Sequence, residues 1–276
     1  MTIRILITGA TGFVGRHVLR SLIEHDILVT AVIRTGSEQR LEINQKIDRV
    51  FKSENIFSET TGWWEQVCEN VDTLIHCAWY TEPGKFLQSS VNLDCLRGTL
   101  ELAQGASRAK VRRFVGIGTC FEYDVSFGEL SVETPLRPFT TYAGAKAAVY
   151  LALSQWFPTQ LIDFTWCRLF YLFGEGEDGR RLVPYLRMQL SVGNVAELSS
   201  GNQIRDFMDV KEAGRIIVNV ALSNHLGAVN VCSGVPVTIR QLAENIADEY
   251  DRRDLLRFGA RHDNGMDPPK IVGILS

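Results

Sequence analysis

The stretch that decides the fold is residues 4–15, which read Arg4-Ile5-Leu6-Ile7-Thr8-Gly9-Ala10-Thr11-Gly12-Phe13-Val14-Gly15. Its first part is a nearly continuous apolar run, which is typical of a strand buried on both faces of a parallel sheet. Three glycines follow at once, and after them apolar residues recur at helical spacing. The stretch therefore predicts a strand, a tight glycine turn and a helix.

A strand, a glycine turn and a helix form the setting in which a dinucleotide binds. Small residues let the backbone approach a pyrophosphate, and the helix start offers free N–H groups and a partial positive charge. The spacing is G-x-x-G-x-x-G rather than G-x-G-x-x-G, and three glycines alone also occur in ordinary tight turns. Because of the strand before and the helix after, we expect cofactor contacts from Gly9, Thr11, Gly12, Phe13, Val14 and Gly15.

The predicted second strand, residues 28–33, ends at Arg34. In this architecture that position lies beside the adenosine ribose, where an acidic residue accepts the 2′-hydroxyl and an arginine pairs with a 2′-phosphate. No Asp or Glu occurs in residues 32–37, whereas Thr35 and Ser37 offer hydroxyl groups. The segment favours NADP(H) over NAD(H), although Arg34 can also be a solvated charge at a strand end.

Composition excludes several classes of function. The 276 residues are 45% apolar with a net charge of −3 and no long basic run, so nucleic acid and anionic membranes are not expected partners. A signal pattern and an apolar stretch of spanning length are both missing, which predicts a cytoplasmic protein. The six cysteines lack paired metal-ligand spacing, so we expect free thiols and no metal site.

Strand and helix patterns alternate along the chain. Further strands are predicted at 49–51, 71–76, 113–118 and 161–168, and long helices at 87–109 and 140–156. This alternation predicts an α/β fold with a doubly wound parallel sheet of the Rossmann type. Composition changes after Gly174, where a polar loop precedes three further helices and a short strand. We predict an NADP-binding domain at 1–174 and a small α+β substrate lobe at 175–276, with elements free to return to the main sheet and a surface tail at 259–276.

Three side chains form the candidate catalytic group. Tyr142 and Lys146 are four residues apart in a predicted helix and so share one face. An ammonium beside a phenol favours phenolate, so we expect the pKa of Tyr142 to fall from about 10 toward neutral pH, which suits proton transfer at an alcohol oxygen. Thr119 follows a predicted strand at the edge where ligands bind. Y-x-x-x-K alone is common on helix surfaces, but its order after a cofactor turn makes an oxidoreductase the leading interpretation.

With these motifs the chain resembles the extended short-chain dehydrogenases/reductases, in the NAD(P)-dependent nucleotide-sugar epimerase/dehydratase family. The resemblance covers essentially the whole length. It rests on residues 8–15, His76-Cys77-Ala78, Asn92, Thr119 with Tyr123, Tyr142 with Lys146, Arg168-Leu169-Phe170 and Arg205-Asp206-Phe207 followed by Val210. It implies that Thr119, Tyr142 and Lys146 are the catalytic residues.

The resemblance also implies where ligands and a partner bind. It adds to the cofactor site Asn55, Ile56, Cys77, Ala78, Trp79, Tyr142, Lys146 and Leu169. The substrate, a nucleotide-diphosphate sugar, is expected at Thr81, Thr119, Cys120, Phe121, Tyr142, Tyr171, Val183 and Arg205. The guanidinium of Arg205 suits bidentate pairing with a diphosphate. A homodimer through the helices 87–109 and 140–156 is implied as well.

Departures from the family pattern narrow the chemistry. In the 4,6-dehydratases an acid–base pair follows the catalytic threonine, whereas this chain has Cys120 and Phe121 there and Glu122 one place too far along. A dehydratase is therefore disfavoured. Tyr171 stands where an asparagine often contacts the substrate diphosphate, so that usual contact is missing.

Reduction of a keto-sugar and epimerisation at the sugar 4-position remain as candidates. Arg34 and the compact lobe favour an NADPH-dependent ketoreductase of a nucleotide-linked 4-keto-6-deoxy sugar. A 4-epimerase with tightly bound NAD is the alternative. A catalytically silent NADP-binding regulator is a third candidate, which the presence of the whole catalytic group disfavours. His17 and His76 are expected to be structural, and the acidic loop residues Glu175, Glu177 and Asp178 to be solvated.

Overall fold

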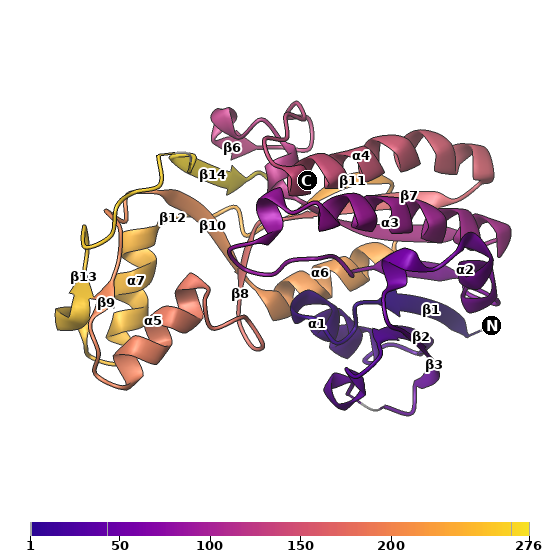
Figure 1. The fold of residues 1–276 in the computed structure, drawn as a ribbon, viewed down its shortest axis with the longest axis horizontal. Helices are drawn as coiled ribbons and strands as arrows, with labels where there is room; N and C mark the ends of the chain where they lie inside the picture. The colour runs from indigo at the N-terminus through magenta and orange to yellow at the C-terminus, as the bar shows by residue number, and fades with distance from the viewer. Residues whose placement is uncertain (1, 43, 266, 276) are drawn as a thin grey trace.

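The computed structural model describes residues 2–42, 44–265 and 267–275. Within them, parallel strands form a seven-stranded sheet in the order β11-β7-β5-β4-β1-β2-β3 (Figure 1). This strand order is that of the doubly wound Rossmann fold, so the predicted fold class is confirmed. The strands are β1 (Ile3–Thr8), β2 (Ile27–Arg34), β3 (Ile47–Ser53), β4 (Thr73–His76), β5 (Arg113–Thr119), β7 (Asp163–Leu169) and β11 (Gly227–Val231).

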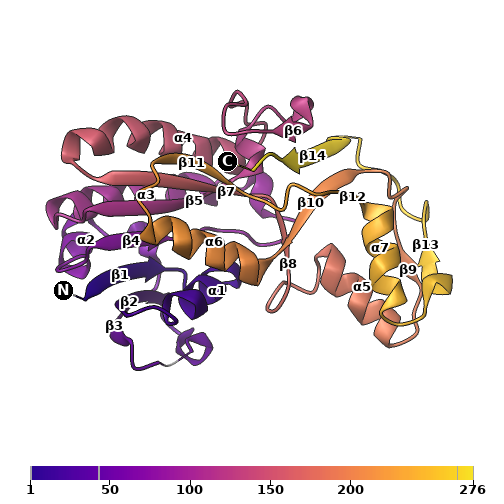
Figure 2. The same ribbon diagram turned by 180° about the vertical axis from the view of Figure 1, so that it is seen from behind.

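Helices cover both faces of this sheet, which explains the apolar run in β1 (Figures 1 and 2). Ile5 and Ile7 point into a core shared with α1 (Phe13–Leu22) and α6 (Val210–Leu222). Leu6 points into the opposite core, beneath α2 (Thr61–Val67), α3 (Val91–Arg108) and α4 (Thr141–Trp156). Since successive strand residues face opposite sides, a strand between two helical layers is apolar throughout.

Helix α3 begins four residues later than predicted. Residues 87–90 belong instead to a short 3-10 turn (Phe86–Gln88) and the two serines after it. The Ser89 hydroxyl accepts a hydrogen bond from the Val91 N–H, and the Asn92 amide donates to the Phe86 carbonyl oxygen. These side chains end the turn and start the helix, because serine and asparagine compete with helical backbone hydrogen bonds.

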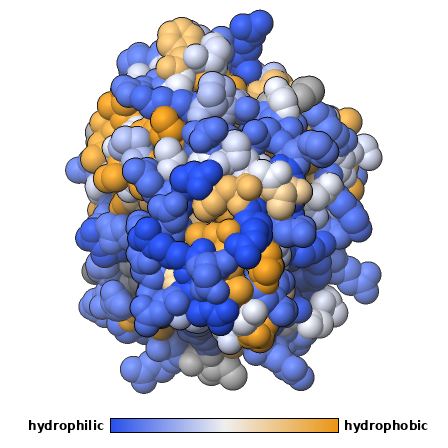
Figure 3. Space-filling model, turned by 90° about the vertical axis from the view of Figure 1, so that its left-hand side faces the viewer, coloured by the Kyte–Doolittle hydropathy of each residue, from blue (hydrophilic) through white to orange (hydrophobic). Residues whose placement is uncertain are grey.

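A smaller lobe surrounds a second sheet. Its strand order is β12-β10-β14-β6, and β8 is also paired to β10. These strands are β6 (Glu129–Leu130), β8 (Tyr171–Phe173), β10 (Ile204–Asp209), β12 (Pro236–Thr238) and β14 (Lys270–Gly273). α5 (Leu182–Ser191) and α7 (Ile239–Asp248) pack together beyond it, beside the strand pair β9 (Ala196–Glu197) and β13 (Leu256–Arg257). The end of this lobe is mostly hydrophilic, with a smaller hydrophobic group near the middle of the view (Figure 3).

Two segments return from the C-terminal part of the chain to the body of the molecule. α6 packs against α1, and β11 extends the main sheet beside β7. The predicted domain boundary between residues 174 and 175 stays a prediction. Both α6 and β11 follow that boundary in sequence. None of the helices that the structure describes is long and apolar enough to cross a membrane.

The predicted surface tail is wrong for residues 270–273. These form β14, which pairs in parallel with both β10 and β6, and Ile271 and Val272 are buried. The strand is only four residues long, and its pairing partners lie far away in sequence. The apolar run at Ile271-Val272 was thus too short to identify a buried strand from the sequence.

Candidate active site

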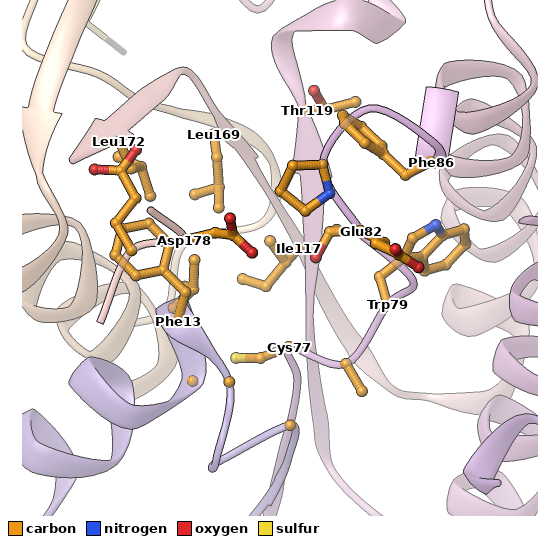
Figure 4. Close-up of a pocket in the computed structure, with 18 of the residues that line it drawn as sticks. Phe13, Cys77, Trp79, Glu82, Phe86, Ile117, Thr119, Leu169, Leu172 and Asp178 are labelled. Atoms are coloured by element: carbon orange, nitrogen blue, oxygen red, sulfur yellow. The ribbon is translucent and has the colours of Figure 1, made fainter. Parts of the chain in front are cut away.

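A cavity of about 870 Å³ lies where the carboxyl ends of the main-sheet strands face the small lobe. Figure 4 shows part of its wall, with Phe13, Leu169 and Leu172 across from Thr119, Phe86 and Trp79. All of the residues predicted for the cofactor or substrate line this cavity. They are Gly9, Thr11, Gly12, Phe13, Val14, Gly15, Arg34, Asn55, Ile56, Cys77, Ala78, Trp79, Thr81, Thr119, Cys120, Phe121, Tyr142, Lys146, Leu169, Tyr171, Val183 and Arg205.

The glycine turn at one end of the cavity has the shape that a dinucleotide requires. Gly9 has φ +73°, and a Cβ there would lie 2.8 Å from the Ala78 nitrogen. A Cβ on Gly15 would lie 2.0 Å from the Gly9 carbonyl oxygen, so only glycine allows α1 to start this close to β1. The N-cap of α1 is Gly12, which has no side chain to cover the first N–H groups. The turn thus leaves helix N–H groups directed at the cavity and fits a pyrophosphate.

A basic and hydroxyl-rich group surrounds the end of β2. Arg34 and Arg40 both line the cavity there, together with Ser37. The Ser37 hydroxyl donates a hydrogen bond to the Arg34 carbonyl oxygen at 2.6 Å. The Thr11 hydroxyl lies 3.3 Å from the Ser37 hydroxyl. Sequence reasoning found Arg34 and missed Arg40, although a second arginine six residues further on was a visible signal.

Asn92 shapes the wall beside the cofactor residues. It accepts a hydrogen bond from the indole N–H of Trp79 at 2.9 Å and donates to the Phe86 carbonyl oxygen at 2.6 Å. Deeper in the wall, His76 bridges the hydroxyls of Thr8 and Thr99, and burial lowers its pKa to about 3. His76 is therefore neutral near pH 7 and has the structural role that was expected.

The three candidate catalytic side chains converge from β5 and α4. Thr119 ends β5, and its hydroxyl lies close enough to the phenol of Tyr142 to lower the pKa of that phenol. Tyr142 lies in the first turn of α4, where the Thr140 hydroxyl caps the helix by accepting from the Ala143 N–H. The Phe86 ring packs edge-on against the Tyr142 ring, with centroids 4.9 Å apart. Thr119 and Tyr142 can therefore hydrogen-bond a single substrate oxygen from two sides.

Lys146 lies deeper than the sequence suggested. Its ammonium donates to the Ile117 carbonyl oxygen at 2.5 Å and lies 3.8 Å above the Trp79 ring. Burial lowers the pKa of Lys146 to about 7, although the nearby Glu122 carboxylate acts in the opposite direction. The amine is thus near half protonation at neutral pH.

The expected lowering of the Tyr142 pKa is wrong for this structure. Burial raises the pKa of the phenol above its ordinary value, and the nearby Thr119 hydroxyl only partly offsets that rise. Lys146 contacts Ile117 and Trp79 instead of the phenol. Spacing four apart on a helix places two side chains on one face, but it does not decide which partner the longer chain reaches.

A buried ion pair fixes the loop behind Thr119. Glu122 accepts hydrogen bonds from the Thr119 backbone N–H at 2.8 Å, from the Trp166 indole and from Arg168 at 2.7 Å. The side chains of Glu122 and Arg168 are 0% and 1% exposed. Glu122 therefore faces into the protein, away from a substrate carbon. The sequence had shown that Glu122 does not occupy the position of the dehydratase acid–base pair, but it had not indicated a role for this residue.

The substrate end of the cavity holds Arg205, Tyr171 and an unpredicted acid. The guanidinium of Arg205 lies 2.7 Å from the carboxylate of Asp267 and 5.4 Å from the Tyr171 ring centre. Asp267 lines the same cavity. It belongs to the tail for which the sequence predicted only surface structure, and no local pattern marks it.

The loop between β8 and α5 adds four charged residues that sequence reasoning did not place at the site. Glu177, Asp178, Arg180 and Arg181 all line the cavity. Asp178 pairs with Arg180 at 2.8 Å, as expected of a solvated loop. Glu177 differs, because burial raises the pKa of its carboxyl to about 7. The GEGEDGRR sequence signalled a flexible charged loop, but not that it folds over the cavity.

The other ionisable groups do not form a metal site. In the stretches 2–42, 44–265 and 267–275, no three His, Cys, Asp or Glu side chains gather so as to hold a metal ion. All six cysteines are free thiols, and burial raises the pKa of Cys120 beside Thr119. His17, in α1, contacts the Glu175 carbonyl oxygen through its ring.

A model of the NAD dependent epimerase/dehydratase family matches residues 5–232. The chain belongs to that family. It is thus an NAD(P)-dependent enzyme of the extended short-chain dehydrogenase/reductase type, a family that acts on nucleotide sugars, as the resemblance implied.

Relatives with curated names are distant but cover most of the chain. The dTDP-6-deoxy-L-talose 4-dehydrogenase (NAD(+)) of Aggregatibacter actinomycetemcomitans is 24% identical, over 90% of this chain and 90% of its own. The GDP-6-deoxy-D-mannose reductase of Pseudomonas aeruginosa is 26% identical, over 90% of this chain and 80% of its own. The UDP-N-acetylglucosamine 4-epimerase of Methanobrevibacter ruminantium superposes with a TM-score of 0.86, at 22% identity, over 100% of this chain and 91% of that one.

Proposed function

We propose that the protein is an NADPH-dependent ketoreductase that acts on the 4-keto group of a nucleotide-linked 6-deoxy sugar. The observation that carries the proposal is that Thr119 and Tyr142 line one cavity together with the glycine turn. Two relatives point to the same substrate class, since both are named for oxidation or reduction of a nucleotide-linked 6-deoxy sugar.

Tyr142 is in the form that can donate a proton near neutral pH, because burial raises the pKa of its phenol. Proton donation to a carbonyl oxygen is the step that a reduction requires.

The residues of the chain would divide the reaction among them. The cofactor, when bound, supplies a hydride to the carbonyl carbon. Tyr142 donates its proton to the carbonyl oxygen, and the Thr119 hydroxyl donates a hydrogen bond to the same oxygen, so the carbonyl becomes a secondary alcohol. Lys146 would hold the cofactor ribose, and a proton from water would restore the phenol of Tyr142.

We propose NADP(H) as the preferred cofactor. The first N–H groups of α1 would hold its pyrophosphate, and Asn55 and Ile56 would lie near its adenine. The two arginines and the hydroxyls of Thr11 and Ser37 suit a 2′-phosphate, since guanidinium groups pair with phosphate oxygens. We also keep the prediction of a cytoplasmic homodimer that uses α3 and α4.

A direct test is a panel of nucleotide-linked 4-keto-6-deoxy sugars, with NADPH oxidation followed at 340 nm. We expect stoichiometric NADPH consumption, and we expect Tyr142→Phe to lower kcat by about 100-fold or more while NADPH affinity changes little. Interconversion of two nucleotide sugars without net cofactor change would instead identify an epimerase. NADPH binding without hydride transfer to any member would support the silent regulator.

A further inference from the structure

Arg205 is a buried cation whose charge is balanced by the protein itself. Its side chain is 2% exposed, one of its Nη atoms donates to the Ile204 carbonyl oxygen, and the other lies 2.7 Å from Asp267. The guanidinium also lies 5.4 Å from the centre of the Tyr171 ring. A buried guanidinium requires a negative partner, because an uncompensated charge in the interior is costly. In this structure the partner is the Asp267 carboxylate.

A substrate diphosphate would need the same guanidinium. Arg205 and Asp267 both line the cavity that holds Thr119 and Tyr142. A diphosphate that approaches Arg205 therefore meets a carboxylate of like charge already in contact with its binding partner. The two anions compete, since each gains most of its stabilisation from one cation.

The two members of the pair differ in their freedom to move. Arg205 lies in β10, where its neighbours pair with β12 and β14 on either side. Asp267 lies outside the regular elements, before Pro268 and Pro269, and its side chain is 38% exposed. Asp267 can turn toward solvent, whereas Arg205 is held in place by its strand. Exchange of one anion for another at Arg205 would thus require only that the Asp267 side chain turn away.

We propose that Asp267 is a specificity-determining residue that competes with the substrate diphosphate for Arg205. This inference rests on the proposed function, in that it takes a nucleoside diphosphate group as part of the substrate. The carboxylate lowers the affinity of the cavity for diphosphate itself and leaves its affinity for an uncharged nucleoside unchanged. Tight binding of a nucleotide then requires contacts with its sugar as well. The free nucleoside diphosphate, which is released when the sugar is transferred elsewhere, is therefore a weak competitor of the substrate.

The experiment measures binding of UDP, dTDP, GDP and CDP to the full chain by calorimetry, for wild type and for Asp267→Asn. We expect Asp267→Asn to tighten binding of the preferred diphosphate by at least about fivefold, with a smaller gain at high salt because Asp267 is partly exposed. The matching uncharged nucleoside and NADPH should bind both proteins equally. Asp254→Asn, which removes an exposed charge of the same lobe, is the control for net charge.

An Arg205→Ala background shows whether the effect passes through the guanidinium. There, Asp267→Asn should give no gain, and the single variants remain informative if the double variant folds poorly. Equal or weaker diphosphate binding by Asp267→Asn overturns the inference, and so does an equal gain in Asp254→Asn. If NADPH is consumed with nucleotide sugars but Asp267→Asn does not tighten binding, only this inference fails. If neither protein binds any nucleoside diphosphate and no keto-sugar is reduced, the proposed function fails with it.

Discussion

At the residue scale, Arg34 carries the proposed choice between the two nicotinamide cofactors. It lies at the end of β2, on the cavity wall near Arg40 and Ser37. We expect Arg34→Ala to weaken NADPH binding by about tenfold and to leave NADH binding nearly unchanged, because only NADPH carries the 2′-phosphate. Dissociation constants from fluorescence titration of both cofactors provide the measurement. An unchanged preference would make Arg34 a solvated charge at a strand end.

Lys146 gives a signed prediction about stability and pH. Its pKa falls from 10.5 in an ordinary setting to about 7 in the folded protein. Between these values the unfolded chain binds a proton that the folded chain does not. Stability therefore drops as pH falls from 10.5 to 7, and the cost is fully present below pH 7. Lys146→Met removes this cost.

We expect Lys146→Met to be more stable than wild type near pH 6.5. We expect this gain in stability to be smaller near pH 9.5. The gain is at most about 5 kcal/mol, since each pKa unit corresponds to about 1.4 kcal/mol. Urea unfolding at the two pH values measures it. Lys211→Met, at an exposed position on α6, is the control, and the pH-dependent gain should be confined to Lys146. A gain that grows with rising pH would contradict the role of burial.

At the scale of elements, β5 and β7 are joined below the active site by a charge network. Glu122, just after β5, pairs with Arg168 of β7, whose guanidinium lies 4.5 Å from the ring centres of both Tyr123 and Tyr150. A Cβ on Gly118 would lie 2.5 Å from the Glu122 carboxylate, so only glycine allows this approach. The network holds the backbone of Thr119 at the cavity.

Glu122→Gln keeps the shape of the side chain and removes its charge. The buried Arg168 then lacks a counter-charge, and we expect a loss of about 3–5 kcal/mol in the free energy of unfolding. Glu129→Gln is the matched control, because its ion pair with Lys270 is largely exposed to solvent and should contribute little to stability. Urea unfolding of the two variants gives the comparison. Losses of similar size would show that burial of the pair does not matter.

The elements also show how far sequence could lead. The strands β1, β2 and β5 were predictable because both of their faces are buried, so their sequences are continuously apolar. β10 and β14 were not, because charged residues interrupt the sequence of β10 and β14 is only four residues long, and their pairing joins segments more than 60 residues apart. The same holds for the site. Motifs brought Thr119 and Tyr142 together, but the contact between Arg205 and Asp267 depends on that distant pairing.

At the scale of the whole molecule, α3 and α4 form an outer face that carries two exposed leucines. Leu93 on α3 and Leu151 on α4 are 57% and 56% exposed. A shallow cavity of about 360 Å³ lies between the two helices, lined by Leu100, Gln104, Ala152, Leu153 and Trp156. Apolar surface of this kind favours association, because its removal from water stabilises the complex. This face suits the proposed homodimer.

Leu151→Glu should weaken that homodimer, because it would bury a charge in the interface on both subunits. We expect the dimer dissociation constant to rise by at least about tenfold, with the fold retained, since the side chain is exposed in the single chain. Sedimentation equilibrium at micromolar concentration measures the change, and circular dichroism checks the fold. Leu226→Glu, 60% exposed in the loop before β11, is the control and should leave the mass unchanged. A monomeric wild type would contradict the proposed homodimer. Equal dissociation of the two variants would place the subunit contact elsewhere.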